Sequence, residues 1–192
     1  MNKSNERSCR IIASISVLMI CVVCALITHF VDFGTTPIQI FGAFAAVIAV
    51  SVVTWKFPLR FSIAALIFTV FAAPMGSVIN LYQLVPFYDR AVHYLSGILL
   101  AEGGMIIVEY IFKKCDVPTH KTLILLFSFL FSCACAGFWE IYEFCADTFL
   151  GADCQGDNTN TMGAIVSGVL GAVTYLIVGA VNIRIKVKNK TK

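Results

Sequence analysis

Residues 123–145 read LILLFSFLFSCACAGFWEIYEFC, an apolar stretch with no charged side chain before Glu140. An α-helix rises about 1.5 Å per residue, so a stretch of this length crosses the roughly 30 Å hydrocarbon core of a bilayer. A surface helix of a soluble protein carries charged residues on one face, and this stretch has no such face. It therefore predicts a transmembrane helix.

Five further stretches of the chain have the same character. Hydrophobic residues make up 59% of the 192 residues and charged residues 13%, against about 25% charged residues in a typical soluble domain. The mean hydropathy is +0.87. These values exclude a soluble enzyme and a nucleic-acid-binding module, and continuous apolar runs disfavour a barrel. We expect an all-α integral membrane bundle, a single membrane domain of residues 1–192, whose six spans are 11–30, 37–55, 61–81, 91–112, 123–145 and 161–181.

Two local signals add detail to these spans. Thr36-Pro37 places a capping hydroxyl before a proline at the first helical position of the second span. Pro74 lies inside the third span and removes a backbone donor, which predicts a kink there.

The basic residues orient the bundle. Thirteen of the fourteen Lys and Arg residues lie at the side that holds both termini, and Arg90 lies at the other. The positive-inside rule then places the N-terminus, the C-terminus and the basic tail 182–192 in the cytoplasm. We expect a multi-pass protein of the plasma (inner) membrane. A signal peptide is the alternative for the first span, but the apolar run is long and no small-residue cleavage motif follows it.

Acidic residues gather at the outer ends of the fourth and fifth spans. Asp89 and His93 are four residues apart, and Glu140, Glu143 and Asp147 follow helical spacing, so each set shares a helix face. Ionised acids in a membrane are costly and require a cation, a basic partner or a shared proton. The loop after the fifth span adds Asp153, Gln155, Asp157 and Asn160.

The topology brings these residues to one depth and predicts one cluster. An oxygen-rich set with one histidine suits Mg²⁺, Mn²⁺ or Ca²⁺, and Zn²⁺ less well. The expected ligands of such a divalent cation are Asp89, His93, Glu140, Glu143 and Asp157. In an enzyme, Glu140 would act as general base or ligand and His93 as acid or ligand. Purely structural roles are the alternative for each of them.

Two other polar features lie within or beside the spans. Glu102 falls near the middle of the fourth span, either as a proton-relay acid or as an acid hydrogen-bonded to a neighbouring helix. Cys145 and Cys154 share the outer side, where a disulfide between them would stiffen the loop.

The sixth span carries ridges of small residues. Gly163, Ser167 and Gly171 form one ridge, a pattern that lets helices approach closely. It predicts packing inside the bundle or contact with a second copy or another membrane partner. Membrane lipid is the other expected partner, attracted by the basic tail, and nucleic acid is not expected.

The region 88–172 resembles the YjdF-like bacterial inner-membrane proteins, a family without an established activity. The resemblance depends on three blocks: Asp89-Arg90-x-x-His93-x-x-x-Gly97; Phe138-Trp139-Glu140-x-x-Glu143; and Gln155-Gly156-Asp157 with Thr161-Met162 and Leu170-Gly171-Ala172. The same layout is more distantly similar to the VanZ-like family of the cell envelope. Asn160, Ala164 and Gly168 stand where the YjdF-like pattern has aspartates, which puts tight ion binding in doubt.

Three functions remain open at this point. The first is an enzyme that uses a metal to cleave or transfer a lipid-linked or phosphate-bearing envelope substrate. The second is a small transporter or ion permease in which Glu102 and Glu140 exchange protons or cations. The third is an accessory protein of the cell envelope that binds an ion without chemistry or uses its acids only for packing.

Overall fold

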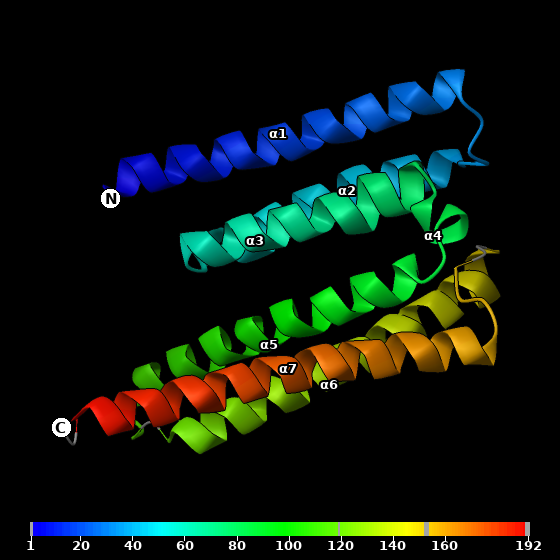
Figure 1. Ribbon diagram of the computed structural model, residues 1–192. Helices are drawn as coiled ribbons and strands as arrows, with labels where there is room; N and C mark the ends of the chain where they lie inside the picture. Colours follow the sequence, from blue (N-terminus) through cyan, green and yellow to red (C-terminus); the bar gives the residue numbers. More distant parts are fainter. Residues whose placement is uncertain (1, 119, 152–153, 191–192) are drawn as a thin grey trace. The chain divides into compact units, whose positions relative to one another are not determined.

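The computed structural model describes residues 2–118, 120–151 and 154–190, without the side chains of residues 150 and 181–190 (Figure 1). All regular elements in this part of the chain are helices, which confirms the predicted fold class. They are α1 Lys3–Phe30, α2 Pro37–Val53, the 3₁₀ turn η1 Thr54–Lys56, α3 Leu59–Val70, the π-helix η2 Phe71–Val78, α4 Leu81–Leu84, α5 Tyr88–Lys114, α6 Lys121–Leu150 and α7 Asn158–Lys190. Six stretches are long and apolar enough to cross a membrane: Lys3–Phe30, Pro37–Lys56, Leu59–Val78, Tyr88–Lys114, Lys121–Phe149 and Asn158–Ala180.

Some helix ends differ from the expected boundaries. The third span was expected to reach residue 81, but η2 ends at Val78. Asn80 then adopts a left-handed backbone with φ of 61°, which a continuous helix does not tolerate. In contrast, α7 continues to Lys190, so most of the expected tail 182–192 has a helical backbone. Its side chains and residues 191–192 lie outside the described residues.

The local signals at Thr36 and Pro74 have clear structural counterparts. The Thr36 hydroxyl accepts from the backbone N–H of Gln39 at 3.4 Å, and the Gln39 side chain accepts from the backbone N–H of Thr36 at 2.7 Å, a complete capping box. At Pro74 the irregularity is a π-helical segment, in which the backbone N–H of Ile79 donates to the Pro74 carbonyl at 3.0 Å.

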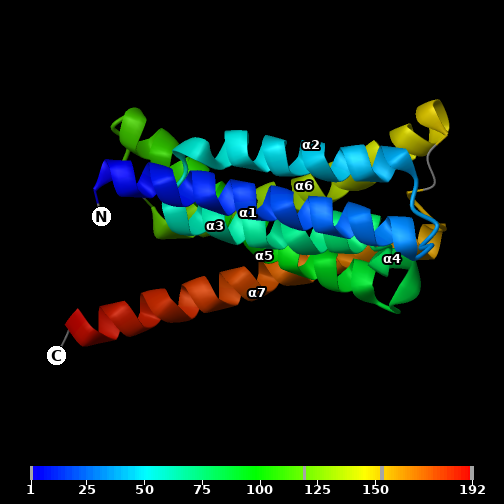
Figure 2. The ribbon, with the colours of Figure 1, turned by 90° about the horizontal axis from the view of Figure 1, so that it is seen from above.

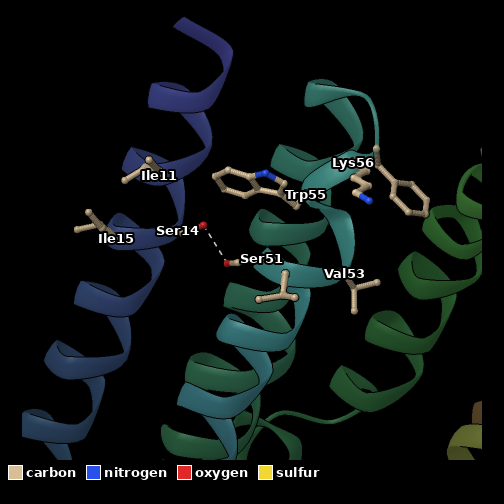
Figure 3. A pocket seen from close by; sticks show the side chains of 9 residues that line it. Ile11, Ser14, Ile15, Ser51, Val53, Trp55 and Lys56 are labelled. Carbon is tan, nitrogen blue, oxygen red and sulfur yellow. Dashed lines mark hydrogen bonds between the residues drawn. The ribbon is translucent and has the colours of Figure 1, made fainter. Parts of the chain in front are cut away.

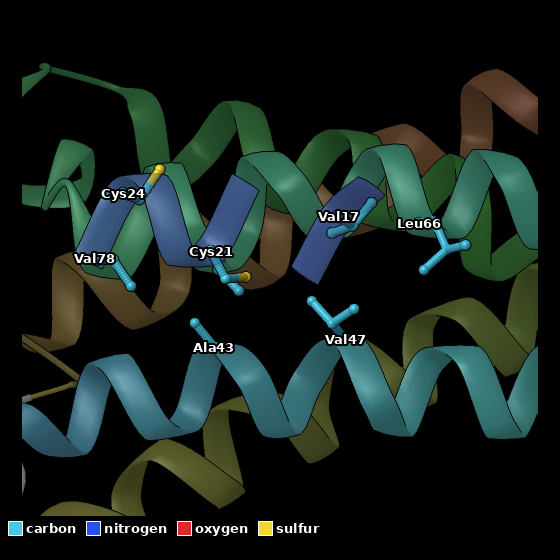
Figure 4. Close-up of a cluster of buried hydrophobic side chains, with 8 residues drawn as sticks. Val17, Cys21, Cys24, Ala43, Val47, Leu66 and Val78 are labelled. Atoms are coloured by element: carbon cyan, nitrogen blue, oxygen red, sulfur yellow. The ribbon is translucent and has the colours of Figure 1, made fainter. Parts of the chain in front are cut away.

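The chain divides into two compact units, Met1–Val92 and His93–Lys192. In the first unit, α1, α2 and α3 run alongside one another (Figures 1 and 2). Its core joins Val17 and Cys21 of α1 to Ala43 and Val47 of α2 and to Leu66 of α3 (Figure 4). Small and β-branched side chains at these positions let the three helices pack closely. The single domain predicted for residues 1–192 stays a prediction.

Arg10 joins α1 to the turn between α2 and α3. Its side chain is 9% exposed. Nη1 donates to the Thr54 carbonyl at 3.3 Å and to the Ser62 hydroxyl, and Nη2 donates to the Phe57 carbonyl at 2.6 Å. These carbonyls lie at and just after the end of a helix, where a cation complements the helix dipole. Arg10 is therefore a structural anchor of the first unit.

In the second unit, glycines bring α5 and α7 into backbone contact. A Cβ atom at Gly97 would stand 2.0 Å from the carbonyl oxygen of Gly168, and one at Gly171 would stand 2.1 Å from that of Tyr94. On the α6 side, the Ser132 hydroxyl donates to the Gly97 carbonyl at 2.8 Å. These close approaches set the spacing of the helices that carry the candidate site.

Candidate functional site

His93 of α5 and Glu140 of α6 form a buried ionisable pair in the second unit. Nε2 of His93 lies 3.8 Å from Oε1 of Glu140, and the two residues are 8% and 5% exposed. Direct hydrogen bonds between nitrogen and oxygen are about 2.7–3.2 Å long, so these two atoms are close but do not form a direct hydrogen bond. Both residues belong to the acidic cluster predicted from the sequence, and the packing of α5 and α6 brings them into contact.

Small residues beside the pair allow the helices to converge there. Ala136 lies one helical turn before Glu140, and a Cβ atom at Gly168 of α7 would stand 3.2 Å from the Ala136 Cβ and 3.7 Å from the His93 carbonyl oxygen. Ala136 and Gly168 are both buried. A larger side chain at either position would push α7 away from the helices that hold the pair.

The loop after α6 folds back toward Glu140. The Asp147 carboxylate accepts from the backbone N–H of Cys154 at 2.8 Å and of Gln155 at 2.9 Å. The Gln155 side chain donates through Nε2 to the backbone carbonyl of Glu140 at 3.5 Å. Asp147 thus holds the loop, and Gln155 reaches the backbone of Glu140.

Glu143 and Asp157, two of the other predicted ligands, bond to residues close to them in the sequence. Glu143 accepts a hydrogen bond from the Trp139 indole N–H at 2.8 Å, one helical turn away. Asp157 accepts from the backbone N–H of Asn160 at 2.7 Å and caps the start of α7. Asp89 is half-buried in the first turn of α5, four residues before His93. Asp153 lies outside the described residues.

Among the described residues, no three His, Cys, Asp or Glu side chains are placed together as a metal-binding group. The predicted five-ligand site stays a prediction, and the contact between His93 and Glu140 is the part of it described here. Whether this pair binds a divalent cation stays a prediction.

Glu102 has a partner on a neighbouring helix. The Tyr175 hydroxyl of α7 donates to Oε2 of Glu102 and lies 3.1 Å from the sulfur of Met105. Glu102 is half-buried. This contact favours the second of its two interpretations, an acid hydrogen-bonded to another helix. Sequence reasoning missed Tyr175, although a phenol inside an apolar span is itself a signal, because its hydroxyl needs a partner there.

The disulfide and the partner-binding ridge of α7 both stay predictions. Cys145 and Cys154 are both thiols in this structure, so the disulfide stays a prediction. On α7, Gly171 lies against the backbone of Tyr94 inside the second unit. Gly163 and Ser167 are half-buried. The binding of a partner through this ridge also stays a prediction.

Of the three positions that lack the expected aspartates, Gly168 lies beside the pair. Ala164 is 1% exposed and Gly168 lies beside the His93 backbone. Both point into the packed second unit, and Asn160 lies at the start of α7 beside Gly156. A carboxylate at Gly168 would add charge close to the buried pair.

Comparison with known protein families gives a match over most of the chain. The family described as "Predicted membrane protein (DUF2238)" matches residues 11–184. No curated protein and no solved structure matches the chain. The matched family is the YjdF family, so the resemblance seen in the motifs is confirmed, whereas the more distant VanZ-like resemblance stays a prediction. Because the match extends over most of its length, the chain belongs to the DUF2238 family of predicted membrane proteins.

Proposed function

We propose that this multi-pass protein resides in the bacterial plasma membrane and binds a divalent cation through His93 and Glu140, near the outer face. The observation that carries the proposal is the buried pair, whose Nε2 and Oε1 atoms are 3.8 Å apart. The distribution of Lys and Arg supports the orientation and the membrane.

The separation of the two atoms suits a shared ion. Bonds from Zn²⁺ to imidazole nitrogen and carboxylate oxygen are about 2.0–2.2 Å long, so two ligand atoms of one ion lie roughly 3–4 Å apart. The observed distance falls in this range and is too long for a direct hydrogen bond. A cation between the two groups would also offset the cost of burying Glu140 as a carboxylate.

Two protein ligands leave most of the coordination shell for water or a substrate. An ion in this position would act as a Lewis acid or lower the pKa of a bound water. His93 would hold the ion through Nε2. Glu140 would hold it through Oε1, and its second oxygen would be the atom able to accept a proton. This leaves both the enzyme and the non-catalytic ion-binding hypotheses compatible with one site.

The test is thermal unfolding of the detergent-purified protein during titration with Mg²⁺, Mn²⁺, Ca²⁺ and Zn²⁺. A ligand of the folded state stabilises by mass action, about 2.7 kcal/mol at a concentration 100 times Kd. We expect at least one ion to raise Tm, and Glu140→Gln and His93→Gln each to abolish the rise.

Glu143→Gln is the matched control, because Glu143 lies one turn away on α6 and binds Trp139. Its response to the ion should equal that of the unmodified protein. An unchanged Tm with all four ions would overturn the proposal.

The transporter hypothesis is the second candidate, and the half-buried Glu102 is its basis. The hydrogen bond from Tyr175 gives Glu102 a structural role, so we rank this hypothesis below ion binding. Proton flux into proteoliposomes, followed with a pH-sensitive dye, separates the two. A transporter would lose the flux in both Glu102→Gln and Glu140→Gln, whereas an ion-binding protein would show no flux above that of empty vesicles.

A further inference from the structure

A groove lies in the first unit, where α1 and α2 pass each other near the N-terminal end of α1. Its volume is about 570 Å³, within the 300–1,000 Å³ usual for small-ligand pockets. Its apolar lining comes from Ile11 and Ile15 of α1 and from Val52 and Val53 of α2. Figure 3 shows Ile11, Ile15 and Val53 on their two helices. All four are at least 40% exposed, so the groove opens to the surroundings of the helices.

Two serines with small side chains, Ser14 and Ser51, leave space in the groove. Ser14 of α1 and Ser51 of α2, which both line the groove, are joined by a hydrogen bond with their hydroxyl oxygens 2.9 Å apart (Figure 3). Ser51 also bonds to the Val47 carbonyl at 2.7 Å. Small side chains leave space where larger residues would fill it, and their hydroxyls already bond to protein atoms. The groove therefore suits an apolar chain rather than a polar ligand.

One end of the groove is amphipathic and basic. Trp55, with its indole turned toward α1, and Lys56 both line this end (Figure 3). Tryptophan is typical of the headgroup level of a membrane, and a lysine there extends its ammonium toward the polar region. No Asp or Glu occurs between Asp32 and Asp89, so α2, α3 and the turn between them carry no acid to offset the charge of Lys56.

Arg10 fixes this end in place. Its guanidinium donates to the carbonyls of Thr54 and Phe57, the residues that flank Trp55 and Lys56. The turn is thereby tied to α1, the opposite wall of the groove. A binding site whose parts are already held in position loses less entropy when it binds.

We infer that this groove is a binding site for one anionic phospholipid, with an acyl chain along the apolar walls and the phosphate at Lys56. The charge of Lys56 selects the headgroup, and the paired serines explain why a chain fits there. The inference involves none of the residues of the cation site, so either proposal can fail without the other.

The experiment is native mass spectrometry of the detergent-purified chain, titrated with phosphatidylglycerol or with phosphatidylcholine of the same acyl chains. One basic residue near an anionic headgroup should favour phosphatidylglycerol by about fivefold. Lys56→Gln should bring the ratio of the two affinities close to one. Lys113→Gln is the matched control, because Lys113 is an exposed basic residue at the end of α5, and it should keep the preference.

Variants that fill the groove test the position of the acyl chain. Ser14→Leu should weaken binding of both lipids severalfold. Ile15→Trp, at an exposed position of the wall, should do the same without altering the packing of α1 on α2. Equal lipid binding in a folded groove variant, or an unchanged lipid preference in Lys56→Gln, would overturn the inference. Competition by glycerol phosphate would indicate a soluble phosphate ligand instead, and a dimer that excludes lipid would indicate a second copy of the chain.

Discussion

Gly97 of α5 lies against the backbone of Gly168 of α7, so closely that a Cβ atom at Gly97 would stand 2.0 Å from the Gly168 carbonyl oxygen. The obstacle is backbone rather than a flexible side chain, so rotation of a side chain cannot relieve the clash. This contact lies one helical turn beyond His93 and holds α7 against the helix that carries the candidate site.

We expect Gly97→Ala to lower the free energy of unfolding by about 1–3 kcal/mol, the usual cost of overpacking. Gly137→Ala is the control, because nothing lies within 4 Å of a Cβ atom there. It should leave stability unchanged or raise it, since alanine favours helix by up to about 1 kcal/mol over glycine. Thermal unfolding in detergent measures both. Equal Tm values for the two variants would contradict the close contact of α5 and α7.

Gly97 and Gly137 differ in a way that the sequence alone does not predict. Apolar length alone predicted six spanning helices, and Thr36-Pro37 predicted the start of α2, because bilayer thickness and helix capping act locally. Whether a glycine in a span touches another backbone depends on which face meets the neighbouring helix. That information lies in the packing of several helices and not in one segment.

The candidate site also combines local contacts, which the sequence indicates, with contacts between helices, which it does not. Helical spacing placed Glu140 and Glu143 on one stripe of α6, yet they have different partners. Glu143 bonds to Trp139 four residues earlier, a local pair that the sequence could have shown. The pairing of Glu140 with His93 requires the contact between α5 and α6. An acid has several ways to be satisfied in a membrane, and the sequence does not rank them.

Arg10 gives the next prediction. Arg10→Met should lower the free energy of unfolding by about 3 kcal/mol, because hydrogen bonds to a charged group contribute roughly 1.5–3 kcal/mol each and their acceptors would lose their donor. Arg7→Met removes the same charge from an exposed position of α1 and should change stability little. Thermal unfolding compares them. A similar loss in both variants would show that net charge, and not the contacts with Thr54 and Phe57, stabilises this end.

A double-mutant cycle tests the contact between Glu102 and Tyr175. Tyr175→Phe removes the hydroxyl donor and Glu102→Leu removes the acceptor, so each should destabilise the protein. Together they should destabilise less than the sum, with a coupling energy of about 0.6–1.7 kcal/mol, as for interhelical hydrogen bonds in membranes. Tyr110→Phe, at a 65% exposed position of α5, replaces Tyr175→Phe in the control cycle and should show no coupling. Additive losses in the first cycle would mean that the hydrogen bond is not stabilising.

The last prediction concerns the orientation of the chain. Cys115 follows α5 and Cys154 follows α6, and both are exposed. The 30 residues of α6 separate the two ends, about 45 Å at 1.5 Å per residue, so one cysteine should lie on each side of the membrane. The basic residues near Cys115 place it in the cytoplasm.

In single-cysteine variants, an impermeant maleimide should label Cys154 in intact cells and Cys115 only after the membrane is opened. Labelling of Cys115 in intact cells would invert the topology and put the His93–Glu140 pair near the cytoplasmic face.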